Sequence, residues 1–260
     1  MYFSHMINII ILGAGNVATH LYLAIKNASG VSVLQWYNRN LKSLETYKNE
    51  TDITDDISSL KIADIYIIAI SDDAISELSE KLPFKDRLVV HTSGSTSLHN
   101  LKRKNNRGVF YPLQTFSKDS QINFKEIPIC IEIEHKSDLE VLRNLAKAIG
   151  STNYKVNSEQ RAALHLAAIF VNNFVNQLYR IGHEITESKS VEFNILKPLI
   201  KETALKLETL SPYLAQTGPA KRNDKKTIKK HLKALEKNES HKAIYELMTK
   251  SIIETHGKKL

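Results

Sequence analysis

The stretch INIIILGAGNVA, residues 7–18, decides the fold of this chain. An apolar run is typical of a buried parallel strand, and here it leads into a glycine turn and then a helical segment. Gly13 permits a tight turn, Gly15 lets a pyrophosphate approach the backbone, and Ala18 lets the helix pack closely on the strand. These residues match the dinucleotide-binding fingerprint GxGxxG/A.

The start of the helix after this turn predicts a phosphate site, because it presents free N–H groups and the positive end of the helix dipole. We therefore expect Gly13, Gly15, Asn16 and Val17 to bind the cofactor. The alternative is a strand-to-helix turn with no ligand, since glycine turns after strands are common.

Strand and helix patterns alternate through the first part of the chain and then give way to helices alone. We expect strands at residues 31–37, 65–70, 87–92, 108–112 and 128–134, and helices at residues 20–26, 41–49, 73–81 and 139–149. Further helices are expected at residues 159–184, 191–210, 227–237 and 241–255. The predicted fold class is α/β: a Rossmann-type, mostly parallel sheet domain over residues 1–157, followed by an all-α domain over residues 158–260.

Composition narrows the class of protein. The 260 residues are 42% hydrophobic and 25% charged, as in ordinary soluble globular proteins. The single cysteine, Cys130, excludes a disulfide framework and a multi-cysteine metal site, and it fits a reducing cytoplasm. We see neither a signal peptide nor an apolar run that could span a membrane. We therefore expect a cytoplasmic protein with no metal and no membrane association.

The net charge of +8 is concentrated near the end of the chain, where residues 218–260 hold 12 Lys and Arg against 5 Asp and Glu. Nucleic-acid binding is one interpretation of this excess. We favour a solvated helix surface, because no aromatic residues or binding motif accompany the charges. Such a surface would also attract an anionic cofactor or substrate.

The end of the second predicted strand indicates which dinucleotide binds. NAD-specific folds place an acidic residue there, whereas this chain has Asn38 and Arg39. A guanidinium suits the 2′-phosphate of NADP(H), and Asn38 can bond the ribose without repelling that phosphate. We therefore expect NADP(H) as the cofactor. The alternative is that Arg39 is an ordinary surface residue in a turn.

Polar residues also follow two later strands, at the edge where ligands bind in this architecture. We expect Ser71, Thr92 and Ser93 to line the cofactor site. His91 ends its strand near the place for a nicotinamide ring, and it is either a catalytic group facing the cleft or a hydrogen-bonded core residue.

The long helix predicted from residue 159 carries a polar stripe. At 100° per residue, Arg161, His165, Asn172 and Asn176 lie within about 60° of one another, with Asn173 at the margin. The rest is apolar, which predicts a buried helix whose stripe faces a substrate pocket. His165 is then the proton donor, and the two asparagines at 172 and 173 orient substrate or cofactor. The alternative is a polar seam between helices or subunits.

Two further stretches complete the set of motifs. In GVFYPLQTFS, residues 108–117, Gln114 is a candidate substrate contact. In TGPAKRND, residues 217–224, Arg222 is a candidate for binding an anionic group, and Asp224 either caps the following helix or pairs with Arg222.

With GAGNVA, HTSGS (residues 91–95) and the Arg161, His165 and Asn173 helix, these stretches resemble a family of Rossmann-like proteins often named "putative NADP oxidoreductases". Its second domain is helical and of unknown function. More distant relatives are pyrroline-5-carboxylate reductase, deazaflavin-dependent NADP reductase and the β-hydroxyacid dehydrogenases. The resemblance implies a nicotinamide cofactor and a helical domain like the C-terminal domain of 6-phosphogluconate dehydrogenase, which commonly forms a homodimer.

In β-hydroxyacid dehydrogenases a lysine on the first helix of the second domain is the proton donor. This chain has no lysine between Lys155 and Lys189, and His165 lies in that region. We expect an oxidoreductase that transfers a hydride to or from a small carbonyl, imine or hydroxy acid. The alternative is a non-catalytic NADP(H) sensor or scaffold whose helical domain binds a protein.

Overall fold

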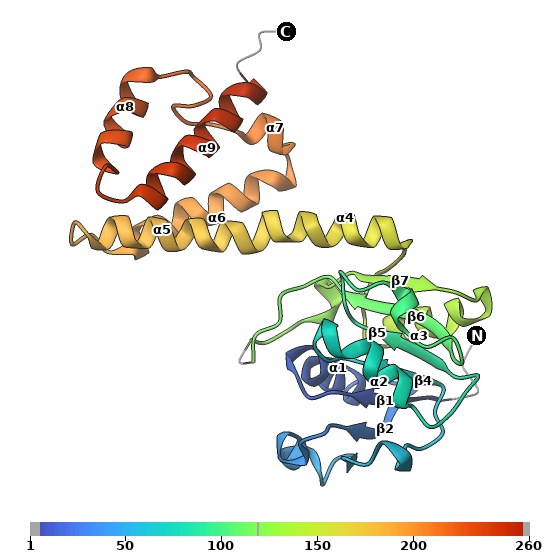
Figure 1. Ribbon diagram of the computed structural model, residues 1–260. Helices are drawn as coiled ribbons and strands as arrows, with labels where there is room; N and C mark the ends of the chain where they lie inside the picture. Colours follow the sequence, from blue (N-terminus) through green and yellow to red (C-terminus); the bar gives the residue numbers. More distant parts are fainter. Residues whose placement is uncertain (1–5, 119, 257–260) are drawn as a thin grey trace. The chain divides into compact units, whose positions relative to one another are not determined.

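The computed structural model describes residues 6–118 and 120–256. Contacts between Cα atoms divide the chain into two compact units, Met1–Val171 and Asn172–Leu260. The first unit contains the sheet, and the second is built from helices (Figure 1). The expected domain boundary after residue 157 stays a prediction; the helix Ser158–Ala168 groups with the sheet.

The sheet of the first unit has eight strands in the order β3-β2-β1-β4-β5-β6-β7-β8. They are β1 (Ile7–Leu12), β2 (Val31–Tyr37), β3 (Asp52–Thr54), β4 (Ile65–Ile68), β5 (Leu88–His91), β6 (Asn106–Pro112), β7 (Ile129–Ile133) and β8 (Asn153–Lys155). All neighbouring strands are parallel except β6 and β7. The first six strands follow the Rossmann order 3-2-1-4-5-6, with the switch point beside β1. The predicted fold class is confirmed.

Alternate side chains of β1 enter two separate cores. Ile9 and Ile11 pack in one core with residues of helices α1 (Asn16–Lys26) and α3 (Leu139–Ala148). Ile10 and Leu12 pack in the other core, with residues of α2 (Ile75–Lys81). A strand that buries both faces needs a continuous apolar run, which explains the sequence of β1.

Three local features differ from expectation. The edge strands β3 and β8 were missed, because three residues are too few to show a periodic pattern. The helix expected at residues 41–49 is a 3₁₀ helix, Leu41–Tyr47. Asn40 caps its N-terminus, and its side chain accepts a hydrogen bond from the Lys42 amide. These residues connect β2 to β3, and the connection is made by short 3₁₀ turns instead of an α-helix.

The long helix predicted from residue 159 is not a continuous α-helix. Helix α4 (Ser158–Ala168) passes into a π-helical turn (Ile169–Phe174) before α5 (Val175–Glu187). A spacing of 100° per residue does not apply across such a turn, so it no longer relates Asn172 and Asn176 to His165. The expected burial is also wrong within the single chain, since Phe170 is exposed.

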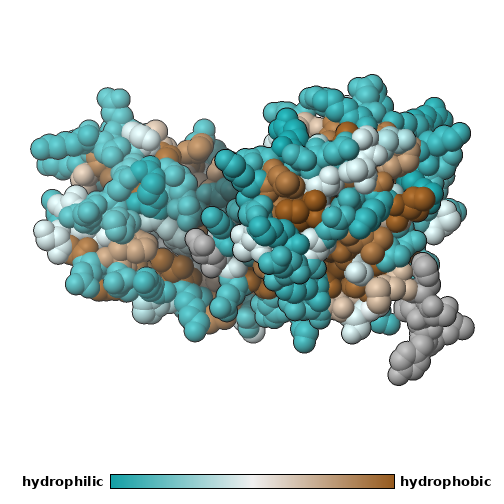
Figure 2. Space-filling view, turned by 90° about the horizontal axis from the view of Figure 1, so that it is seen from below, coloured by the Kyte–Doolittle hydropathy of each residue, from teal (hydrophilic) through white to brown (hydrophobic). Residues whose placement is uncertain are grey.

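The second unit holds the remaining helices. They are α5, α6 (Lys197–Leu205), α7 (Pro212–Ala215), α8 (Lys225–Ala234) and α9 (Glu239–His256). Among the described residues of this unit, Ile181 and Ala220 are the only buried apolar side chains. Hydrophobic side chains such as Ile195 and Leu199 are exposed instead. Hydrophobic patches among hydrophilic ones are also visible on the molecular surface in Figure 2.

Candidate functional site

The glycine turn after β1 is held tightly by the neighbouring strands. Gly13 has a φ of +119°, and a Cβ atom there would lie 2.2 Å from the carbonyl oxygen of Ala69. Its amide donates to the Tyr37 carbonyl at 2.8 Å, and the buried Trp36 Nε1 donates to its carbonyl at 2.6 Å. Only glycine fits this conformation and this space.

Gly15 stands in contrast, because a Cβ atom there would meet nothing within 4 Å. It caps the N-terminus of α1, where no side chain accepts a hydrogen bond and no acidic residue occupies the first turn. Asn16 is exposed, and its side-chain amide donates to the Phe116 carbonyl at 2.9 Å. The backbone at this helix end is thus open to a ligand and suited to an anion.

Four of the sequence-predicted cofactor residues line one pocket of about 110 Å³. They are Gly13, Asn38, Arg39 and Ser71. Glu77 lines it as well, and hydrogen bonding to Lys81, with a smaller electrostatic contribution from Arg39, keeps the pKa of Glu77 below its usual value. Arg39 is exposed, and the side-chain amide of Asn38 donates to the Asn40 carbonyl at 2.9 Å.

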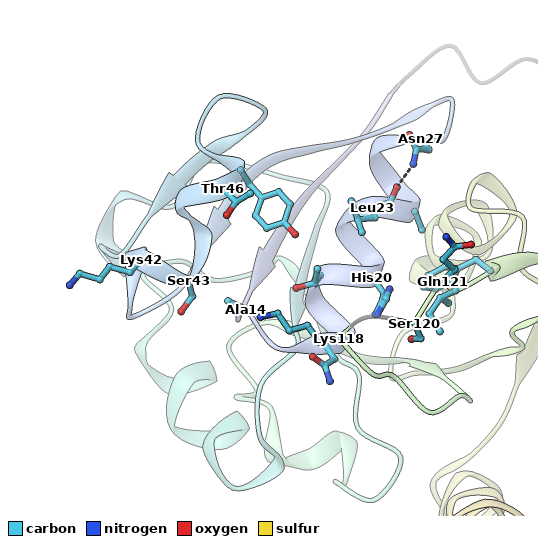
Figure 3. A pocket seen from close by; sticks show the side chains of 16 residues that line it. Ala14, His20, Leu23, Asn27, Lys42, Ser43, Thr46, Lys118, Ser120 and Gln121 are labelled. Atoms are coloured by element: carbon cyan, nitrogen blue, oxygen red, sulfur yellow. Dashed lines mark hydrogen bonds between the residues drawn. The ribbon is translucent and has the colours of Figure 1, made fainter.

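A larger groove of about 950 Å³ runs along α1 (Figure 3). Ala14 and Asn16 line it from the turn, Lys42 and Ser43 line it from the 3₁₀ helix, and Lys118 reaches toward Ala14. Among the described residues that line the groove, none is an aspartate or a glutamate. The groove therefore favours anionic groups, and it was not predicted from the sequence.

The loop after β5 is folded by its own side chains. His91 is fully buried, and its Nδ1 atom accepts a hydrogen bond from the Ser93 amide at 3.2 Å. The Ser93 hydroxyl oxygen accepts from the amides of Ser95 and Thr96 at 3.1 and 2.9 Å. Burial, aided by the charge of Arg161, lowers the pKa of His91 to about 4, so this imidazole is neutral at physiological pH.

Arg161 is buried beneath the same loop. Its Nε atom donates to Glu132 of β7 at 3.0 Å, and its Nη1 atom donates to the carbonyls of Ser93 and Gly94 at 3.2 and 2.9 Å. Glu132 also accepts from the hydroxyl of Ser158 at the start of α4. Because Nε and Nη1 donate to these partners, the geometry indicates a structural role for Arg161 in holding the loop.

His165 lies one turn further along α4 and is half-buried. Its Nδ1 atom is 3.4 Å from the hydroxyl oxygen of Tyr111, near the end of β6. Sequence reasoning missed Tyr111, Glu132 and Trp36. Tyr111 lies within the quoted stretch of residues 108–117, and Trp36 is the only tryptophan of the chain. Neither fact shows which residue the side chain contacts.

Four further predicted residues are exposed. Gln114 is exposed and accepts from the neighbouring Thr115 amide at 2.8 Å. Asn172, Asn173 and Arg222 are exposed residues of the second unit, and their roles stay predictions. Asp224 caps α8 by accepting from the Thr227 amide at 3.0 Å, as one of the two alternatives foresaw.

Residues 6–118 and 120–256 contain no cluster of three His, Cys, Asp or Glu side chains that could hold a metal ion. None of their helices is long and apolar enough to cross a membrane.

The strand order and the glycine turn at the switch point define the class as a Rossmann-type dinucleotide fold. Comparison with solved structures identifies the family. A Bacteroides fragilis protein named "putative NADP oxidoreductase" is 37% identical, with 96% of this chain and 98% of that chain aligned and a TM-score of 0.86. This chain belongs to the same family.

Further similarities concern part of the chain or its fold. A family model described as a domain of unknown function, DUF2520, matches residues 127–252. A Thermotoga maritima protein is 19% identical, covers 96% of this chain and 98% of its own, and has a TM-score of 0.75. A pyrroline-5-carboxylate reductase from Coxiella burnetii shares the fold, with 14% identity, 98% of both chains covered and a TM-score of 0.57. No curated protein sequence matches significantly.

Proposed function

We propose that this protein is an oxidoreductase that uses NADP(H) to transfer a hydride to or from a small carbonyl, imine or hydroxy acid. The observation that carries the proposal is the pocket that collects Gly13, Asn38, Arg39 and Ser71 beside an uncapped helix N-terminus. The similarity to a protein named "putative NADP oxidoreductase" supports it.

The chain's own residues fit a bound dinucleotide. The open backbone at Gly15 and Asn16 would bind the pyrophosphate through N–H groups, with Lys42 and Lys118 of the groove supplying positive charge. Arg39, which lines the smaller pocket together with Gly13, would pair with the 2′-phosphate. When bound, the cofactor supplies or accepts the hydride.

We assign His165 the proton transfer that accompanies the hydride. It is half-buried beside the loop after β5, at the carboxyl edge of the sheet where ligands bind in this fold. In reduction, an imidazolium would give its proton to the carbonyl oxygen or imine nitrogen, and in oxidation the neutral ring would take it back. His91 is buried and neutral, so we assign it to the support of the loop rather than to catalysis.

The experiment is an NADPH titration followed by a panel of small carbonyls, imines and hydroxy acids, monitored by cofactor absorbance. We expect tight NADPH binding and turnover with at least one class. The variant His165→Ala should lose about 100-fold or more in kcat, because general acids contribute about 10²–10⁴-fold, while it binds NADPH as before. Binding without turnover would favour the non-catalytic sensor or scaffold. Failure to bind would overturn the proposal.

We also propose that the protein is a homodimer joined through its second unit. That unit lacks a hydrophobic core in the described residues, while side chains such as Ile195 (68% exposed) and Leu199 (62% exposed) face solvent. An isolated helical body needs a buried apolar core, and a second copy would supply the missing contacts. The single, buried Cys130 fits our proposal of a reducing cytoplasmic location.

Light scattering during size exclusion tests the dimer. We expect a mass of twice the chain mass of 29.5 kDa. Leu199→Glu on α6 should dissociate the dimer. The control Lys201→Glu, on the same helix, puts the same carboxylate at an already polar position and also removes a positive charge, and it should leave the dimer intact. A monomeric wild-type protein would contradict this proposal without affecting the one on cofactor binding.

A further inference from the structure

Tyr111 and His165 form a polar pair between two elements of the first unit. Tyr111 lies on β6, at the penultimate position, and His165 lies on α4, 54 residues later. The ring centroids are 6.3 Å apart at an angle of 65°, so one ring meets the other edge-on. The hydroxyl oxygen and the Nδ1 atom, 3.4 Å apart, are the facing polar atoms. Catalytic hydrogen bonds are often this long until substrate binds.

The loop after β5 is shaped to admit this pair. A Cβ atom on Gly94 would lie 2.6 Å from His165 Nδ1 and 2.7 Å from the Cζ atom of Tyr111. Any side chain at residue 94 would therefore displace one ring or the other. The Gly94 carbonyl in turn accepts from the buried Arg161, which Glu132 holds. The surface beneath the pair is thus fixed by a buried ion pair.

The hydroxyl of Tyr111 is neutral and can accept a hydrogen bond from His165. Burial raises the pKa of its hydroxyl, so the group stays protonated and carries no charge at physiological pH. A neutral hydroxyl oxygen accepts a hydrogen bond from an imidazole N–H. If Nδ1 keeps its proton through such a bond, the other ring nitrogen, Nε2, is the atom that gives and takes a proton.

We propose that Tyr111 is a positioning residue that accepts a hydrogen bond from Nδ1–H of His165 and thereby reserves Nε2 for proton transfer to the substrate. In reduction, the Nε2 proton of the imidazolium passes to the oxygen or nitrogen that is being reduced. The ring is left neutral, with its proton on Nδ1. The catalytic part of this inference rests on the proposed function, whereas the tautomer of His165 does not.

The primary test reads the tautomer directly by NMR of ¹⁵N-histidine-labelled protein, with His165→Asn to assign the signal. Neutral histidine in water prefers the proton on Nε2, so we expect the opposite, Nδ1–H form in the wild type. Tyr111→Phe should return His165 toward the Nε2–H form. An Nε2–H form in the wild type, or no change in the variant, would overturn the proposal whether or not a substrate is known.

The chain offers a matched control for this substitution. The hydroxyl of Tyr245 on α9 lies 2.8 Å from Nδ1 of His231 on α8, so Tyr245→Phe removes the same kind of contact elsewhere. That variant should leave the His165 signal unchanged. With a substrate in hand, Tyr111→Phe should lower kcat by about 10-fold or more with the KM for NADPH unchanged. Equal kcat values for wild type and Tyr111→Phe would contradict the positioning role.

Discussion

The Nε atom of Arg161 lies 3.0 Å from a carboxylate oxygen of Glu132, and the Arg161 side chain is 2% exposed. The same guanidinium donates to two carbonyls of the loop after β5. One buried ion pair therefore joins strand β7, helix α4 and the loop after β5. Removing one partner of such a pair leaves an uncompensated charge inside the protein.

We expect Glu132→Gln to destabilise the protein by about 3–5 kcal/mol in chemical denaturation, because the buried guanidinium loses its counter-charge. The control is Glu134→Gln, directly after β7, which breaks the pair with Arg107 of β6. Glu134 is 25% exposed, so the cost there should be smaller. Equal losses for the two variants would show that burial of the Glu132 pair carries no special weight.

Gly13 and Gly15 should respond differently to alanine. At Gly13 a methyl group would overlap the Ala69 carbonyl and the φ of +119° is strained for alanine, so Gly13→Ala should lower the melting temperature strongly. At Gly15 the φ is −79° and the space is open, so Gly15→Ala should fold normally. Calorimetry should show a normal melting temperature for Gly15→Ala, together with weakened NADPH binding. Unchanged NADPH affinity in this variant would argue against a phosphate at the turn.

Arg39→Ala should weaken NADPH binding by about 10- to 100-fold, because a hydrogen bond to a charged group contributes about 1.5–3 kcal/mol. NADH lacks the 2′-phosphate, so its affinity should change little. The control Arg103→Ala removes an exposed guanidinium that does not line the pocket. The test is to titrate the wild type, Arg39→Ala and Arg103→Ala with NADPH and with NADH. An unaltered preference for NADPH in Arg39→Ala would refute the role of this residue.

His91 should make stability depend on pH between its ordinary pKa of 6.5 and its folded value of about 4. In that window the unfolded chain binds a proton that the folded chain does not, so stability is lost as pH falls from 6.5 to 4. The difference in pKa corresponds to about 3 kcal/mol. His91→Asn keeps an acceptor for the Ser93 amide and should remove this part of the dependence. An exposed control, His135→Asn, should retain it, and identical curves for wild type and His91→Asn would contradict the assignment.

The parts of the fold that could be predicted from the sequence depend on neighbouring residues. The turn after β1 follows from an apolar run and two glycines, and Arg39 follows from its place at the end of β2. The structure groups Arg39 with Gly13 in one pocket because parallel strands end at the same edge. No long-range contact had to be known in advance.

The remainder depends on contacts between distant residues or on irregular backbone. Tyr111 and His165 are 54 residues apart, and Glu132 and Arg161 are 29 apart, so no local pattern relates them. Arg161 has the same side chain whether it binds a substrate or a buried carboxylate, and only the fold distinguishes the two. The π-helical turn at residues 169–174 changes the rotation per residue, so the side-chain directions calculated at 100° per residue are wrong for residues beyond it.

The hydrogen bond from Trp36 to the Gly13 carbonyl gives the chain a fluorescent reporter of its own. Trp36 is the only tryptophan in the sequence, and it is fully buried against the turn that we assign to the pyrophosphate. Its emission therefore comes from a single, known place, and a reduced nicotinamide ring, which absorbs near the emission of tryptophan, would quench it. Entry of the dinucleotide can thus be followed in the unlabelled wild-type protein.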